Sequence, residues 1–250
     1  MTGVQTPGAR GKHTLSRMRL ALWCAPVVLL VGALAPPFAT AARHHDWAAA
    51  LQFTTFAVVV PGLVVIGAPW RLLGLGRAAA ALSEARRRHP ERARSVAITG
   101  VTLVAVTAWR TPPAVDFLAR QGWAVALEAL TLVASGVGLW LECAPSPPLA
   151  PRSPRPMRIA MATLVMWAIW VLAYAMGMSH GDWYPAYQHL AGHGLSLIAD
   201  QEIAAGLTWG VTGCCFIPLS IWNLVEWLRS DDDADEEMHR LLREERRRAT

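Results

Sequence analysis

The sequence predicts an all-α fold: a polytopic membrane bundle of about six transmembrane helices, with both termini in the cytoplasm. Three observations predict it, namely six long apolar runs, a low content of charge, and positive charges that gather in alternate gaps between the runs. Hydrophobic residues make up 54% of the chain and charged residues only 16%, whereas soluble domains contain roughly 25% charged residues.

Most of the apolar runs are near the ~20 residues that an α-helix needs to cross the hydrocarbon core of a bilayer. The first run should kink or end at Ala35, because Pro36 and Pro37 follow it. The third run is short, and we expect it to continue past Pro112 and Pro113 as a broken or interfacial segment, since prolines interrupt the helical hydrogen-bond ladder. In chain order the runs are residues 20–38, 47–69, 96–109, 123–143, 159–178 and 203–227.

The distribution of positive charge predicts the orientation of the bundle. Twenty of the 23 lysine and arginine residues lie in four alternate segments: the N-terminus, the second and fourth loops, and the C-terminal tail. The other gaps contain only Arg43, Arg110 and Arg120. Because positively charged loops stay on the cytoplasmic side during insertion, both termini should be cytoplasmic. The first run fits this alternation, so we expect it to be a retained anchor and not a cleaved signal peptide.

The same topology divides the chain into three parts. They are a basic cytoplasmic segment (residues 1–19), a membrane domain of about six spans (residues 20–228) and a charged cytoplasmic tail (residues 229–250). The net charge of +5 should face anionic lipid headgroups, so membrane lipids are expected partners and nucleic acid is not. The second loop should contain a short surface helix, and the proline-rich fourth loop an irregular linker. In the tail, Ser230 and the aspartates after it predict the capped start of a solvated helix.

Polar residues of the spans collect at the predicted outer side. Glu128 lies about 7 Å into the fourth span by helical rise, and Asp200 and Gln201 lie at the outer mouth of the sixth. An ionisable group at membrane depth is costly and by default indicates function. As structural alternatives, Glu128 snorkels outward or pairs with Arg120 or Arg110. The alternative for Asp200 is an interfacial cap on the sixth span.

Methionine and histidine residues near the same side are candidate metal ligands: His44, His45, Met176, Met178 and His180. Thioether and imidazole groups suit copper, and soft sulfur ligands favour Cu(I). Met176 and Met178 lie two positions apart and would share a ligand set only where the helix ends. The alternatives are ordinary helix packing for the methionines and an exposed loop pair for the two histidines. The cofactor is undetermined, with copper as the candidate. His189 and His193 follow in the third outer loop.

Several segments together resemble the CtaG-type cytochrome c oxidase assembly family. Residues 194–209 contain Asp200 and Gln201 followed by an Ala-Gly-Leu step, and they resemble the last-span motif of that family. The span ends in Trp-Leu-Arg, as the family's last span does. Further similar segments are residues 61–70, 127–140, with its glutamate, and 184–187, with its Tyr-Pro-x-Tyr stretch.

The chain departs from the family at most of the family's histidines. Members usually carry a His-x-x-x-His pair before the proline of residues 61–70, a His-x-x-Glu-His pattern around the glutamate, and a Trp-His pair in the third span. The corresponding positions here are Ala49, Phe53, Val125, Ala129 and Arg110. The resemblance implies copper delivery to the oxidase on the outer side. Either copper binds through other outer residues, or the chain keeps the scaffold without the metal.

The resemblance implies a non-enzymatic protein of a bacterial-type inner (plasma) membrane that assists the assembly of a terminal oxidase and contacts its subunits. Two alternatives remain open: a metal-free membrane scaffold that binds oxidase subunits, and a small transporter with Glu128 and Asp200 as coupling carboxylates. Paired interrupted helices would favour a transporter, and the sequence shows no convincing pair. No hydrolase or nucleotide-binding motif occurs, so an enzyme is not expected.

Overall fold

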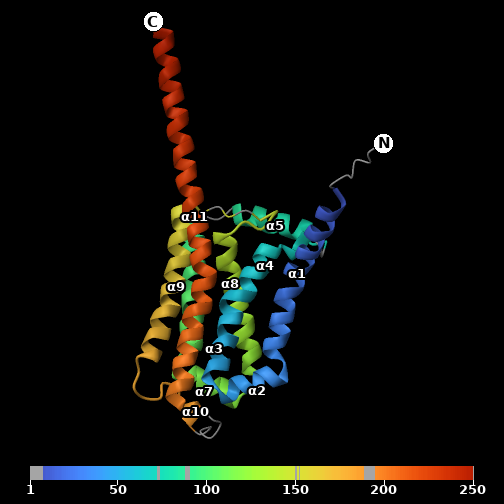
Figure 1. Ribbon diagram of the computed structural model, residues 1–250, viewed down its shortest axis with the longest axis vertical. Coiled ribbons are helices and arrows are strands. Elements are labelled where there is room, and N and C mark those ends of the chain that lie inside the picture. Colours follow the sequence, from blue (N-terminus) through green and yellow to red (C-terminus); the bar gives the residue numbers. More distant parts are fainter. Residues whose placement is uncertain are drawn as a thin grey trace, which may run out of the picture.

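The computed structural model is an all-helical bundle, as the sequence predicts (Figure 1). It describes residues 8–71, 74–87, 91–149, 151, 153–188 and 195–249. Within these ranges the chain forms no β-strand. The helices are α1 (Gly8–Leu34), α2 (Pro36–His44), α3 (Asp46–Thr54), the π-helix η1 (Thr55–Val59), α4 (Val60–Gly67), the 3-10 turn η2 (Pro69–Arg71), α5 (Gly76–Arg87), α6 (Glu91–Trp109), α7 (Pro112–Arg120), α8 (Ala124–Cys143), α9 (Arg155–Gly177), α10 (Pro185–Gln188) and α11 (Leu197–Ala249).

The chain passes repeatedly between two ends of the bundle. Helices α2, α7 and α10 lie at one end, which we call the outer end in keeping with the charge distribution (Figure 1). Helix α5 lies at the opposite, inner end, where α1 begins and the tail of α11 leaves the bundle (Figure 1). This arrangement agrees with both termini on one side of the membrane.

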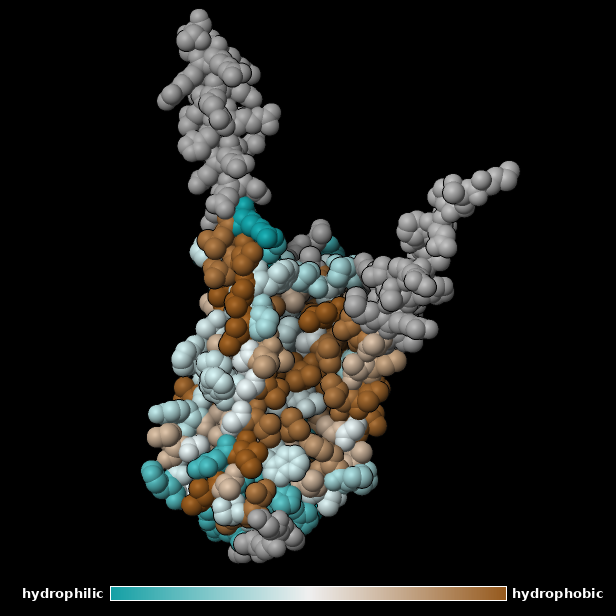
Figure 2. All heavy atoms as spheres, viewed as in Figure 1, coloured by the Kyte–Doolittle hydropathy of each residue, from teal (hydrophilic) through white to brown (hydrophobic). Residues whose placement is uncertain are grey.

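Four helical segments of the described residues are long and apolar enough to cross a membrane: Asp46–Gly67, Ala124–Cys143, Arg155–Gly177 and Leu197–Ser230. The pair Ala21–Leu34 and Pro36–His44, bent by 56°, brings the total to five if it is one span. Helix α6 is not among them, so a sixth span stays a prediction. Exposed apolar side chains cover much of the face between the two ends (Figure 2), as expected of a surface in contact with lipid.

The prolines act where the sequence predicts. Helix α1 ends at Leu34, and α2 begins at Pro36 after a sharp bend. Helix α6 ends at Trp109, and Pro112 opens the separate helix α7, whose first turn needs no amide donor there. The surface helix of the second loop is α5, and the described residues between α8 and α9 are non-helical, as expected.

The tail differs from the prediction in one respect. It is helical, but Ser230 does not begin a new helix, because α11 continues without a break from the last span to Ala249. The Ser230 hydroxyl donates to the carbonyl of Trp227, one turn earlier, at 2.6 Å. No glycine or proline lies between the span and the tail to interrupt the helical ladder.

The core forms where α4 and α8 pack closely together. A Cβ at Gly136 would lie 2.6 Å from the Pro61 ring and 2.7 Å from the Ala57 carbonyl oxygen. Only glycine therefore allows this close approach of the two helices. Further in, Trp140 stacks on Phe216 of α11, with ring centroids 5.8 Å apart.

Candidate functional site

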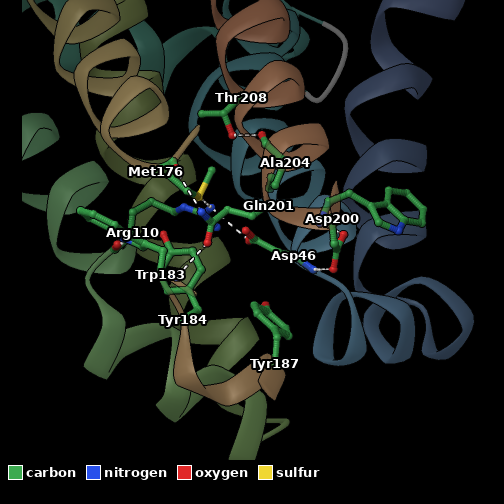
Figure 3. A network of polar contacts seen from close by, with 12 residues as sticks. Asp46, Arg110, Met176, Trp183, Tyr184, Tyr187, Asp200, Gln201, Ala204 and Thr208 are labelled. Carbon is green, nitrogen blue, oxygen red and sulfur yellow. Dashed lines mark hydrogen bonds and ion pairs between the residues drawn. The ribbon is translucent and has the colours of Figure 1, made fainter. Parts of the chain in front are cut away.

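A group of buried polar side chains lies at the outer end of the bundle, between α3, α8, α9, α11 and the segment around α10 (Figure 3). We call it the outer polar cluster. It consists of Asp46, Arg110, Glu128, Met176, Tyr184, Tyr187, Asp200 and Gln201, which line three small cavities of about 10 to 20 Å³. The three residues proposed from the sequence, Glu128, Asp200 and Gln201, thus belong to one region of the structure.

Arg110 lies at the centre of the cluster, immediately after α6, and is only 6% exposed. Its Nη2 lies 3.3 Å from an Asp46 carboxylate oxygen and 3.6 Å from the Met176 sulfur. The guanidinium carbon lies 5.4 Å from the Phe53 ring centroid and 5.0 Å from that of Tyr184. A carboxylate, a thioether and two aromatic faces therefore stabilise this buried positive charge.

Glu128 is on α8, one turn inside its outer end, and is 4% exposed. The snorkelling alternative is therefore wrong for this side chain. Glu128 and Arg110 line the same cavity of about 20 Å³, which is large enough for one water molecule. Of the two arginines considered from the sequence, Arg110 is the one that shares the cavity.

Asp200 caps a helix, but not its own. Its two carboxylate oxygens accept hydrogen bonds from the backbone amides of Asp46 at 2.8 Å and Trp47 at 3.0 Å, at the start of α3. Helix α11 is capped instead by Ser196, whose hydroxyl accepts from the Ala199 amide at 3.2 Å. The structural alternative, in which Asp200 caps the sixth span, is therefore wrong. Asp200 joins two helices because orphan amides at a helix start favour a carboxylate.

Gln201 fixes the end of α9 and the loop that follows it. Its side-chain oxygen accepts from the Trp183 amide at 2.8 Å, and its nitrogen donates to the Met176 carbonyl at 2.8 Å (Figure 3). The adjacent residues Asp200 and Gln201 thus hold two different pieces of backbone at the outer end.

The segment around α10 closes the cluster from outside. The Tyr184 hydroxyl donates to the Arg110 carbonyl at 3.1 Å, and the Tyr187 hydroxyl donates to the Ala42 carbonyl at 3.3 Å. Burial raises the pKa of Tyr184 to about 12, so its hydroxyl keeps the proton that it donates. Asp116 of α7 accepts from the Ala186 amide at 2.9 Å and secures the same segment.

The candidate copper ligands do not all face one place. Met176 is buried against Arg110, whereas Met178 is 58% exposed and His180 is exposed. His44 is exposed on α2, and the Nδ1 of His45 lies 3.9 Å from an Asp200 carboxylate oxygen. In the described part of the chain no group of three or more His, Cys, Asp or Glu residues is arranged to hold a metal. His189 and His193 lie outside the described residues.

Sequence reasoning missed Asp46 entirely and considered Arg110 only as a replaced histidine and a partner for Glu128. A signal was present, because each is a charged residue directly beside a tryptophan at a span end: Asp46 before Trp47, and Arg110 after Trp109. Opposite charges at the same membrane level are candidates for pairing.

The comparisons with known proteins identify the family. The family described as cytochrome c oxidase caa3 assembly factor (Caa3_CtaG) has a model that matches residues 1–230. The chain therefore belongs to this family, which confirms the resemblance seen in its motifs. Neither the curated proteins nor the solved structures give a match.

Proposed function

We propose that this member of the caa3 assembly-factor family assists the maturation of a terminal oxidase as a metal-free scaffold that binds oxidase subunits in a bacterial-type plasma membrane. The family assignment supports the role in oxidase assembly. The proposal that this scaffold binds no metal is based on the Arg110 guanidinium, which lies at the centre of the outer polar cluster in contact with Asp46 and Met176.

Arg110 supplies the positive charge that a bound cation would bring. A guanidinium stays protonated and offers no lone pair to a metal, and it engages the Asp46 carboxylate and the Met176 thioether. A Cu(I) ion ~4 Å from the guanidinium would be repelled by about 4 kcal/mol at an effective dielectric constant of ~20. Copper binding inside this cluster is therefore unfavourable.

Three positions where the family resemblance places histidines surround the same guanidinium. Ala49 and Val125 line the cavity that Arg110 shares with Glu128, and Phe53 lies against the guanidinium. None of these three side chains offers a metal ligand. Their convergence on Arg110 supports the loss of a whole ligand set, with the surrounding scaffold retained.

The hydrogen bonds of the cluster support a scaffold with a preformed outer end. Asp200 joins α11 to α3, and Gln201 joins α11 to the end of α9. Tyr184 joins the segment around α10 to the residue after α6. A surface held by buried hydrogen bonds loses little conformational freedom when a partner binds.

Copper delivery through the outer surface is the rival function. His44, Met178 and His180 are exposed near the outer end, and their side chains suit copper. Delivery through them would make Cu(I) binding depend on these residues and not on Arg110.

The test measures Cu(I) binding and oxidase maturation in parallel. Purified wild-type protein should release Cu(I) to a competing chelator, yet restore oxidase activity and haem spectra in a deletion strain. The variant Ala49→His, Val125→His, Arg110→His returns three imidazoles to the cluster and should retain Cu(I) better. Tight stoichiometric binding by the wild type that is lost in Met178→Leu, His180→Ala would establish copper delivery instead.

The small transporter remains the third hypothesis. Two spans contain a local irregularity without a break: the π-helix η1 precedes Pro61 in the span Asp46–Gly67, and Pro218 lies inside the continuous helix α11. Both border a groove that reaches the inner end, whereas Glu128 and Asp200 lie at the outer end. These irregular segments therefore do not frame the two carboxylates, which disfavours a role of Glu128 and Asp200 in coupled transport.

A further inference from the structure

A groove of about 510 Å³ lies between α4, α8 and α11, outside the outer polar cluster. Its walls are almost entirely apolar, and Ile66 at its inner end is 54% exposed while Trp222 is 39% exposed. The face between α1 and α11 carries a broad area of apolar side chains (Figure 2). A groove on such a face opens toward lipid.

The groove runs along the length of the bundle, which is also the direction of an acyl chain in the inner leaflet. Along the span Asp46–Gly67 it extends from Val59 of η1, near the middle, to Ile66 of α4, near the inner end. Seven residues correspond to about 10 Å along the helix. The groove therefore runs from the middle of the bilayer to its inner surface.

The groove wall also contains a hydrogen-bond donor without a partner. Trp140 is 5% exposed, and its indole nitrogen is buried with no hydrogen-bond partner in the described part of the chain. It lies three residues before the inner end of α8 at Cys143, about 4.5 Å along the helix. Trp140 therefore lies near the inner end of its span, where tryptophan is enriched at the level of the membrane–water interface.

An arginine lies above the inner end of the groove. Arg229 follows Trp222 by seven residues on α11, two turns along the same helix face and about 10 Å nearer the inner surface. Its side chain is 72% exposed and lies 3.6 Å from Glu226. A basic residue at this level attracts lipid phosphate.

We propose that this groove is a binding site for one phospholipid of the inner leaflet. One acyl chain lies between α4 and α11, an ester carbonyl accepts from the Trp140 indole N–H, and the phosphate meets Arg229. The proposal does not depend on the function proposed above, since it involves none of the residues of the outer polar cluster.

The proposal can be tested by native mass spectrometry. The full chain is released from nanodiscs of phosphatidylcholine and phosphatidylglycerol, and the number of phospholipid molecules that stay bound to it is counted. The wild type should retain one molecule. Cys214→Phe, which places a ring in the groove, should abolish retention. Arg229→Gln should lower the retained fraction of phosphatidylglycerol about fivefold, from about 1 kcal/mol per basic residue. Trp140→Phe, which removes only the N–H, should also lower retention.

The matched control is Val171→Phe, a lipid-exposed position on α9 that does not line the groove. It should retain lipid like the wild type, and circular dichroism should show equal helix content in all variants. Equal retention by wild type, Cys214→Phe and Arg229→Gln would overturn the proposal. So would unchanged lipid retention together with loss of oxidase subunit capture in Cys214→Phe, which would assign the groove to a partner helix.

Discussion

Among the described residues, one buried acid–arginine pair lies at each end of the bundle, and the two pairs differ in how completely their carboxylates are hydrogen-bonded. At the inner end, Glu142 accepts from Arg94 Nε at 3.0 Å and Nη2 at 3.1 Å, and from the Ser153 hydroxyl at 3.1 Å. At the outer end, Asp46 receives one contact from Arg110 at 3.3 Å. The second Asp46 carboxylate oxygen has no hydrogen-bond partner among the described residues.

This difference separates a structural pair from a candidate functional one. The bidentate geometry of Glu142 and Arg94 is the strong form of an ion pair, and it ties α6 to α8 and the linker after α8. The Asp46 carboxylate keeps an unused acceptor inside a cluster that also contains Glu128. Unsatisfied buried groups require an explanation, so the outer polar cluster is the candidate functional site.

The largest effect should come from the inner pair. Glu142→Ala leaves the Arg94 charge without its bidentate partner and should cost about 3–5 kcal/mol of unfolding free energy. Thermal unfolding in detergent and the amount of protein in the membrane measure this loss. Oxidase activity should fall only in proportion to that amount. A stable variant that fails in maturation would reverse the roles of the two ends.

Asp46→Asn should have a smaller structural effect than its inner counterpart, Glu142→Gln. We expect about 1–2 kcal/mol, because one hydrogen bond to Arg110 is weakened while the aromatic contacts of the guanidinium remain. Oxidase maturation should decrease more than the amount of protein does. Equal destabilisation by the two variants would show that the outer pair is as structural as the inner one.

Asp200→Ala should cost about 1 kcal/mol, because two amides at the start of α3 lose their cap. Asp200→Asn should cost less, since asparagine caps about as well as aspartate. Hydrogen exchange of the Asp46 and Trp47 amides reports the cap directly. Full oxidase activity from both Asp200→Asn and Gln201→Ala at normal abundance would leave the pair with a structural role only.

Glu128→Gln should have the smallest effect on stability, within about 1 kcal/mol, because glutamine keeps the size of the buried side chain that lines the small cavity. A scaffold should keep its oxidase maturation in this variant. Complete loss of maturation at normal abundance would instead support a proton-carrying or transport role for Glu128.

The sequence by itself determined the class of fold, the helix breaks before Pro36 and Pro112, and the family. Apolar runs, prolines after Ala35 and Trp109, and the alternation of positive charge predicted helices and orientation, because membrane partition and helix breaking depend on residues close together in the chain. The tail shows the limit of a local signal, since Ser230 is a good cap but α11 has no break at which to use it.

The tertiary structure alone decided which polar groups meet. Asp200 caps an amide 154 positions away, and Arg110 reaches Asp46 over 64 positions. Neither pairing is encoded by spacing along the chain, because it depends on which helix faces pack together and at what depth. The missing histidines became interpretable in the same way: only the packing of α3 and α8 around Arg110 shows that a guanidinium lies among those positions. Because these groups are buried, each such contact contributes to the stability of the fold, since an unpaired polar group inside the bundle is costly.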